Sequence, residues 1–189
     1  MPGSARGLPT LIVVSGPPGS GKTTLARAIA RGVGCPAVCR DEIKEGMAHA
    51  TPGFVPATGD ELTMRTLPTF FAVLELLLDA GVTTVAEAAF QDHIWRPRLE
   101  PLRDLARLRV VHCAVSAEMA FARIARRRQE CPQRRAHADS GPIDAAAYIR
   151  RHREFERVRV DAPWIEVDTT EGYRPGLEQV IAFASALDG

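Results

Sequence analysis

Lysine is almost missing from this sequence. Of 24 lysine and arginine residues, only Lys22 and Lys44 are lysines. The Asn-Lys-x-Asp motif by which GTPases recognise guanine needs a lysine, and neither lysine stands in such a motif. The Ser-Gly-Gly-Gln signature of transporter ATPases is also missing. These absences argue against both classes, and they draw attention to the two positions where lysine persists.

Cysteine pairs, long apolar runs and a large net charge are lacking as well. The cysteines at 35, 39, 113 and 131 form no C-x-x-C pair, so we expect buried free thiols rather than a structural zinc site. No apolar run reaches ~18 residues, and "MPGSARGLPT" has no signal-peptide core, so we expect a cytoplasmic, reduced protein without a membrane segment. The net charge of +1 gives no overall attraction for nucleic acid, which we do not expect as a partner.

Five short apolar runs predict the strands of a sheet. The first, "LIVVS", is a continuous β-branched run of the kind that is buried on both faces of a parallel sheet. The predicted strands are 11–15, 36–40, 82–90, 109–115 and 164–168.

Helical patterns alternate with these strands. Beyond the helix that follows the first strand, the predicted helices include 59–80, 95–108, 116–130, 145–159 and 174–187, with Pro68 expected to kink or split the first of these. Strands alternating with helices predict a three-layer α/β fold, with a five-stranded parallel sheet flanked by helices. With 46% hydrophobic residues in 189, we expect a single domain spanning 1–189.

The stretch "GPPGSGKT" satisfies the P-loop pattern G-x-x-x-x-G-K-[ST], and it lies between a predicted strand and a predicted helix. Its glycines allow backbone N–H groups to surround phosphates at the positive end of the helix. Lys22 is expected to reach the β- and γ-phosphates, and Thr23 to offer its hydroxyl to Mg²⁺ with water. The predicted nucleotide contacts are Gly16, Gly19, Ser20, Gly21, Lys22, Thr23 and Thr24.

Asp41 ends the second predicted strand, in "VCRDEIKEGMAHA". Ligands of open α/β sheets bind beyond the carboxyl ends of the strands, so Asp41 is placed to accept the proton of a substrate hydroxyl. The alternative is that Asp41 caps the helix that follows it.

An arginine-rich segment, about 121–146, is predicted to be a helical lid. Arg123, Arg126 and Arg127 lie within about one helical turn of one another, with Arg123 and Arg127 on a shared face. Such a lid would neutralise the transferred phosphoryl group, and the alternative is an ordinary solvated basic face.

With "GPPGSGKTTLARAIA" and "CRDEIKEGMAHA" on one chain, the sequence resembles the P-loop small-molecule kinases that include chloramphenicol phosphotransferase, the 5′-kinase domain of polynucleotide kinase and the zeta-toxin-like, AAA-type kinases. The resemblance implies a P-loop nucleoside-kinase-like fold with Asp41 as base and with Lys22, Arg123 and Arg127 in catalytic roles. It further implies that Arg126 binds the donor and that the 167–175 loop, with Thr169, lies against the nucleotide base.

Glu87 stands where this group carries a Walker-type aspartate. Three roles are open for it: a water-mediated contact with Mg²⁺, a contact with the substrate hydroxyl, or a buried structural acid.

The predicted acceptor side mixes aromatic, acidic and polar groups, which suits a neutral polyhydroxylated or nucleoside-like molecule better than a polyanion. The residues expected to bind the acceptor are Lys44, Glu87, Phe90, Gln91 and Trp95.

The leading hypothesis is a kinase that moves the γ-phosphoryl group of ATP or GTP, with Mg²⁺, to a hydroxyl of a small molecule such as an antibiotic or a nucleoside-like natural product. The alternatives are a polynucleotide 5′-hydroxyl kinase-like enzyme and a nucleotide-sensing regulatory module that binds without turnover. The sequence favours neither ATP nor GTP and does not fix the oligomeric state.

Overall fold

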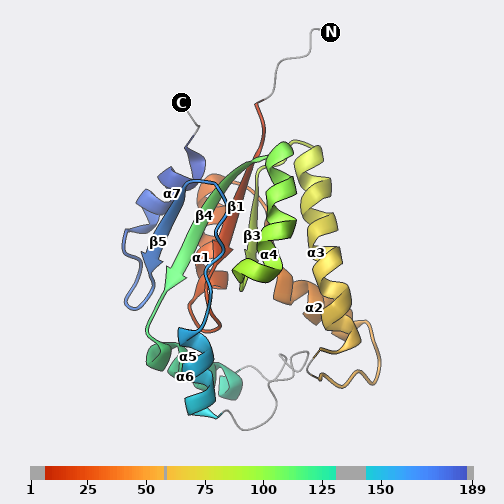
Figure 1. The fold of residues 1–189 in the computed structure, drawn as a ribbon, viewed down its shortest axis with the longest axis vertical. Helices are drawn as coiled ribbons and strands as arrows, with labels where there is room; N and C mark the ends of the chain where they lie inside the picture. Colours follow the sequence, from red (N-terminus) through yellow and green to blue (C-terminus); the bar gives the residue numbers. More distant parts are fainter. Residues whose placement is uncertain (1–6, 58, 131–143, 187–189) are drawn as a thin grey trace.

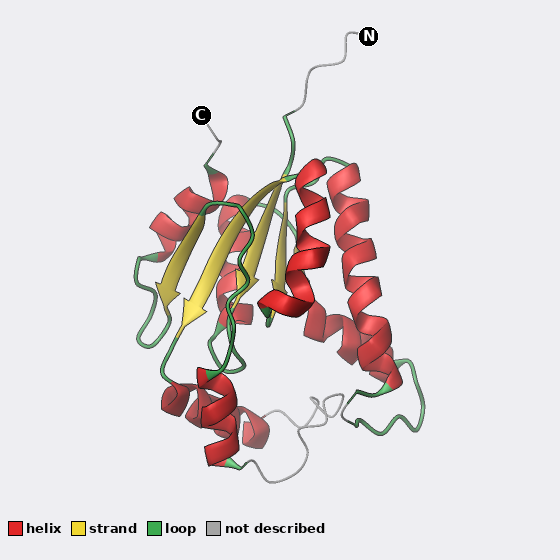
Figure 2. Cartoon of the chain, in the orientation of Figure 1, coloured by secondary structure: helices red, strands yellow, loops and turns green. Residues whose placement is uncertain are grey.

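A five-stranded parallel sheet forms the centre of the protein (Figures 1 and 2). The computed structural model describes residues 7–57, 59–130 and 144–186, without the side chains of 128–130. The strand order is β2-β3-β1-β4-β5, and every pairing is parallel. The strands are β1 (Thr10–Ser15), β2 (Ala37–Cys39), β3 (Thr84–Ala88), β4 (Arg107–Ala114) and β5 (Trp164–Asp168).

Helices cover both faces of the sheet, so the predicted three-layer α/β fold is confirmed. One face packs against α1 and α7, and the other packs against α3 and α4, while α2, α5 and α6 gather near the carboxyl ends of the strands (Figure 1). The helices are α1 (Lys22–Val33), α2 (Arg40–His49), α3 (Glu61–Asp79), α4 (Asp92–Leu99), α5 (Ala117–Glu130), α6 (Ala145–Arg153) and α7 (Leu177–Ser185), with a 3-10 helix, η1, at Glu100–Asp104.

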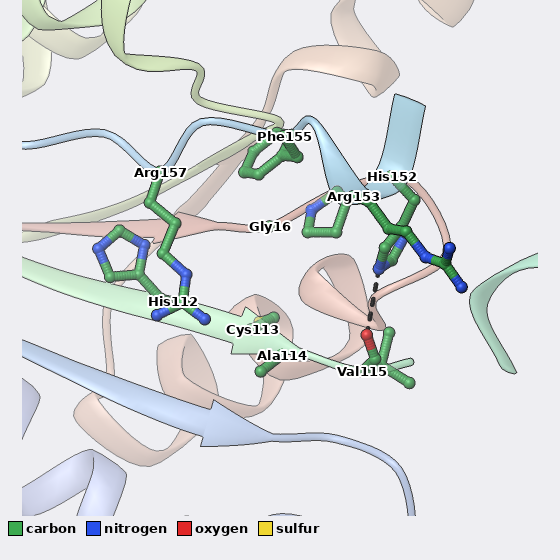
Figure 3. Close-up of a pocket in the computed structure, with 10 residues that line it drawn as sticks. Gly16, His112, Cys113, Ala114, Val115, His152, Arg153, Phe155 and Arg157 are labelled. Carbon is green, nitrogen blue, oxygen red and sulfur yellow. Dashed lines mark hydrogen bonds between the residues drawn. The ribbon is translucent and has the colours of Figure 1, made fainter. Parts of the chain in front are cut away.

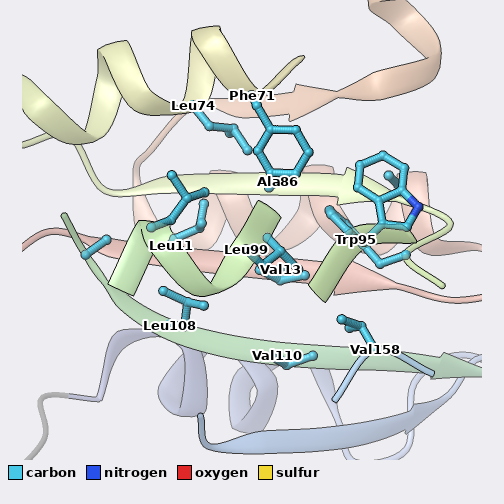
Figure 4. Close-up of a cluster of buried hydrophobic side chains, with 14 of the residues drawn as sticks. Leu11, Val13, Phe71, Leu74, Ala86, Trp95, Leu99, Leu108, Val110 and Val158 are labelled. Carbon is cyan, nitrogen blue, oxygen red and sulfur yellow. The ribbon is translucent and has the colours of Figure 1, made fainter. Parts of the chain in front are cut away.

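The central strand β1 is buried on both sides, as its continuous apolar run predicts. Leu11 and Val13 join the core beneath α3 and α4, whereas Ile12 and Val14 join the core beneath α1 and α7. Figure 4 shows the first of these cores, in which side chains from helices and strands interdigitate. This burial holds the end of β1, where the P-loop begins, in a fixed position.

Three predicted helices differ from the observed ones. The helix predicted at 95–108 ends at Leu99 and gives way to η1, because Pro101 has no N–H to continue the α-helical pattern. The helix predicted at 145–159 ends at Arg153, and the chain then crosses the sheet, where Val158 enters the core and the Arg159 N–H donates to Asp92 at 2.7 Å. Pro68 does not split α3, whose buried apolar face outweighs the lost hydrogen bond.

Of the cysteines that the structure describes, Cys35, Cys39 and Cys113 are free, as expected, and Cys131 lies outside the described residues. Among the described helices, none has both the length and the apolar composition needed to cross a membrane.

An aromatic cluster fastens α3 and α4 to the sheet. Phe70 has no exposed surface and contacts the rings of Phe71, Phe90 and Trp95 with centroids 5.6, 6.1 and 5.9 Å away. Because aromatic pairs add to the free energy of burial, this cluster makes a large contribution to the stability of this half of the fold.

Phe70→Ala is therefore expected to lower the free energy of unfolding by about 3–5 kcal/mol, since it removes a fully buried ring. Leu76→Ala on the same helix removes a side chain that is 70% exposed, and should change stability by less than about 0.5 kcal/mol. Urea denaturation monitored by circular dichroism measures both. Equal losses for the two variants would contradict this description of the core.

Candidate active site

The P-loop, residues 16–23, joins β1 to α1. At two of its positions the backbone adopts a conformation that strongly favours glycine. Gly19 and Gly21 both have φ of +78°, in the left-handed region. A Cβ on Gly19 would lie 2.5 Å from the Ala120 carbonyl oxygen, so α5 packs directly against this loop. The loop is thus shaped by its glycines and held from outside by α5.

The P-loop residues fit a bound triphosphate. Ser20 is fully buried, and its Oγ has no hydrogen-bond partner among the residues that the structure describes. The first turn of α1 contains no acidic side chain, and Gly21 provides no side-chain cap, so the helix N-terminus keeps its partial positive charge. Both features suit an anionic ligand that accepts hydrogen bonds.

Glu87 lies beneath the P-loop, at the carboxyl end of β3. Its Oε2 accepts a hydrogen bond from Thr23 Oγ1 at 3.1 Å, and its Oε1 lies 3.7 Å from Lys22 Nζ. Burial raises the pKa of Glu87, and the positive charge of Lys22 opposes this shift. Because Thr23 uses its hydrogen on Glu87, its oxygen lone pairs remain for a cation, so this pair of residues fits Mg²⁺.

Asp41 occupies the first turn of α2, next to this cluster. Cys39 is the N-cap residue of α2, so Asp41 follows the cap rather than forming it. Its Oδ1 lies 3.2 Å from Arg40 Nη1, and its side chain is 39% exposed. Cys39 pairs with Glu87 across β2 and β3, so Asp41, two residues after Cys39, stands at the same edge of the sheet as Glu87, and its charge contributes to the raised pKa of Glu87 after burial.

Lys44 is buried and paired, which makes it a poor candidate for the acceptor contact predicted from the sequence. Its side chain is 4% exposed, and Nζ lies 2.9 Å from Asp60 Oδ2. Asp60 also caps α3 by accepting from the Thr63 N–H at 2.7 Å. Burial works to raise the pKa of Asp60, but the hydrogen bonds from Lys44 and Thr63 outweigh it and leave the pKa well below its usual value. Lys44 therefore joins α2 to α3.

Two other predicted acceptor contacts lie in the core. Phe90 has no exposed surface and Trp95 has only 6%, and their rings pack together with centroids 4.6 Å apart. From the sequence alone, an aromatic side chain near the edge of a sheet is equally consistent with a ligand-binding wall and with the hydrophobic core. Here both rings pack against Phe70 on α3, so they belong to the core. Gln91 is half-buried and forms an antiparallel bridge with Arg157.

Arg123 connects α5 to the loop after β5 and, through it, to the P-loop. Its Nη2 donates to the carbonyl oxygens of Thr169 and Thr170 at 2.6 and 3.0 Å. Thr169 is buried, and its Oγ1 donates to the Ser20 carbonyl at 2.7 Å. Both residues therefore support the P-loop from outside.

The remaining predicted lid and nucleotide contacts are exposed at the surface. Arg126 and Arg127 are exposed on α5, and Thr24 is exposed on α1. Residues 131–143 of the predicted lid lie outside the described residues. The donor contacts of these arginines stay a prediction.

Residues of α6 that the sequence did not single out also contact the P-loop region. Tyr148 is buried, and its hydroxyl donates to the Pro18 carbonyl at 2.5 Å. His152, one turn later, contacts the Val115 carbonyl through Nε2 at 3.1 Å. Their i, i+4 spacing indicates a shared helix face, but nothing in the sequence shows what that face contacts.

Several solved structures share this fold. A protein of Chloroflexus aurantiacus described as a candidate kinase has a TM-score of 0.80 and 22% identity, over 93% of this chain and 96% of that chain. Kti12 from Chaetomium thermophilum, in complex with ADP-AlF3, has a TM-score of 0.65 and 15% identity, over 94% of this chain and 100% of that chain. Shikimate kinase from Acinetobacter baumannii, in complex with shikimate, has a TM-score of 0.59 and 20% identity, over 94% and 93%.

These likenesses confirm the kinase-like P-loop fold, whereas among curated proteins no relative matches this chain. A family model described as an AAA domain matches residues 11–163, which include the P-loop, Asp41, Glu87 and α5. The match covers most of the 189 residues, and the chain therefore belongs to the AAA domain family (AAA_33).

Proposed function

We propose that this protein is a phosphotransferase that moves the γ-phosphoryl group of ATP or GTP to a hydroxyl group of a small molecule. The observation that carries the proposal is the proximity of two parts of one site. The phosphate cradle with Lys22 and Thr23 and the carboxylate of Asp41 both lie around Glu87, at the carboxyl ends of neighbouring strands.

On the donor side, the P-loop residues bind and orient the triphosphate. The backbone N–H groups of residues 19–23 surround the phosphates, and Lys22 turns from Glu87 to the γ-phosphate as the charge on that group develops. The Thr23 hydroxyl would hold Mg²⁺, with water, and the bound ion would supply further neutralisation of the phosphate charge. Arg123, Arg126 and Arg127 supply the cationic side of the donor site from α5.

On the acceptor side, Asp41 aligns the hydroxyl and takes up its proton. The Asp41 side chain is 39% exposed and stands in the first turn of α2, where the positive end of the helix favours the charged carboxylate that a base needs. Arg40 Nη1 donates to Asp41 Oδ1 at 3.2 Å and so helps to orient the carboxylate. Since phosphoryl transfer passes through a loose transition state, most of the rate gain comes from this alignment.

The comparisons support a kinase of this class, since shikimate is an alcohol bound by one kinase that shares the fold. An antibiotic or a nucleoside-like natural product is our preferred acceptor class. The other readings are polynucleotide 5′-kinase activity, which the net charge of +1 disfavours, and nucleotide sensing without transfer.

Lys22→Ala tests the phosphate site. We expect the affinity for ATP or GTP to fall by about tenfold and turnover by about 100-fold or more, because a positioned cation is lost from the transferred group. Isothermal titration and a coupled kinase assay measure the two effects. Arg31→Ala, an exposed change in the last turn of the same helix, serves as the control. Normal kinetics for Lys22→Ala would refute this role.

Asp41→Asn tests the base. We expect the nucleotide affinity to stay the same while acceptor phosphorylation falls by about 10²–10⁴-fold, the usual contribution of a positioned proton acceptor. Glu42→Gln is the matched control, because it removes the neighbouring carboxylate of the same helical turn. If Asp41→Asn turns over like the parent protein, another residue takes the proton.

A panel of acceptors tests the substrate class. Aminoglycoside, phenicol and nucleoside antibiotics and a 5′-hydroxyl oligonucleotide are incubated with the protein, Mg²⁺ and ATP or GTP, and analysed by mass spectrometry. We expect a small molecule to gain the mass of one phosphate. Phosphorylation of the oligonucleotide alone would establish the polynucleotide kinase alternative, and nucleotide binding without any product would favour the sensing module.

A further inference from the structure

A cavity borders the start of the P-loop, between β4 and the segment that follows α6 (Figure 3). Its volume is about 260 Å³, slightly below the ~300–1,000 Å³ that is usual for small-molecule pockets. Figure 3 shows β4 on one side and His152, Phe155 and Arg157 on the other. The walls consist of Gly16, Pro17, His112, Cys113, Ala114, Val115, His152, Arg153, Phe155 and Arg157.

His152 brings an unused hydrogen-bond acceptor to this cavity. Its Nε2 lies 3.1 Å from the Val115 carbonyl, and a carbonyl oxygen only accepts, so Nε2 carries the hydrogen (dashed line in Figure 3). When the imidazole carries only this one hydrogen, Nδ1 holds a lone pair. That atom is buried and has no hydrogen-bond partner within the described part of the chain.

His112, on β4, is a second imidazole with a buried, unpaired nitrogen. It is 6% exposed, and its Nδ1 likewise has no partner among the described residues. Burial lowers the pKa of His112 to about 4, helped by the positive charge of Arg157, so the ring is uncharged at neutral pH. Leaving two polar nitrogens unpaired costs free energy, and a ligand that satisfies them recovers it.

The arginines around the cavity already have carboxylate partners. Arg153 lies 3.1 Å from Glu118, and Arg157 forms an ion pair with Glu166. Next to Asp41, the cations of α2 are paired as well, Arg40 with Asp41 and Lys44 with Asp60. A carboxylate or phosphate on the acceptor would have to displace a protein carboxylate from each cation, whereas an uncharged molecule leaves these ion pairs intact.

We propose that the cavity is a binding site for the acceptor, and that its imidazoles select an uncharged molecule bearing hydroxyl or amine donors. Its place against Gly16 and Pro17 puts the bound molecule beside the loop that holds the nucleotide. A small rotation of the His152 ring, of the kind that binding commonly brings, exposes Nδ1 to the donor group. This inference rests on the proposed kinase function.

The test uses the whole protein and matched probes that differ by one charge: methyl shikimate against shikimate, and uridine against uridine monophosphate. Titrations are followed by ¹⁵N NMR of the histidine side chains and by the fluorescence of Trp164, whose ring lies 5.9 Å from that of His112. The buried Trp95 is replaced by Phe for the fluorescence measurement only. We expect the uncharged probes to shift the Nδ1 resonance of His152, and the anionic probes to bind at least about tenfold more weakly.

His152→Gln isolates the acceptor atom, since the Gln amide retains a donor for the Val115 carbonyl but offers no lone pair at the Nδ1 position. We expect its affinity for uridine or methyl shikimate to fall about three- to tenfold, with the affinity for ATP unchanged. His93→Gln is the control, because His93 is an exposed histidine on α4 outside the cavity. If His152→Gln does not fold, the titration of the parent protein still tests the inference, because it needs no variant.

Tighter binding of the anionic probes, or no response of His152 and His112 to any uncharged probe, would overturn the inference. The binding measurements do not depend on phosphoryl transfer, so the two proposals can be tested separately. The kinase function alone would be contradicted if the parent protein phosphorylated no acceptor, and the assignment of the base if Asp41→Asn remained fully active. Conversely, phosphorylation of an anionic acceptor would support the proposed kinase function and contradict the proposed selectivity for uncharged molecules.

Discussion

The buried carboxylate of Glu87 is the contact on which the arrangement of the site depends. It receives a hydrogen bond from Thr23 and lies within ion-pair distance of Lys22, so it positions the two P-loop side chains that the triphosphate needs. A carboxylate removed from water is tolerated when it is paired, and burial shifts its pKa upward all the same. Because β3 lies between β1 and β2, the same residue also stands between the P-loop and Asp41.

Contacts from α5, α6 and the loop after β5 hold the P-loop from its outer side. Ala120 approaches Gly19, Tyr148 donates to Pro18, and Arg123 with Thr169 reaches Ser20. The P-loop is therefore fixed before a nucleotide arrives, which reduces the entropy that binding costs. The basic segment predicted to be a helical lid thus begins, at α5, with residues that hold the P-loop in place.

The sequence predicts those features that a local physical rule determines. The β-branched run of β1, the glycines of the P-loop and the strand end before Asp41 each follow from such a rule, and the sheet assembled from them is confirmed. Lys44, Phe90 and Trp95 could not be assigned in this way, because their partners lie far along the chain. A lysine that is 16 residues from Asp60 looks like a ligand contact until α3 is placed beside α2. His112 and His152 were missed for the same reason, since the cavity they share exists only after α6 folds back onto β4.

The central claim is that the P-loop and Asp41 act on the same phosphoryl group, and a crystal structure with Mg²⁺ and a non-hydrolysable ATP analogue tests it most directly. The account predicts that the γ-phosphate contacts Lys22 Nζ and lies about 6 Å from the Asp41 carboxylate, which leaves room for one acceptor hydroxyl between them. A triphosphate whose terminal group points away from Asp41 would contradict the account.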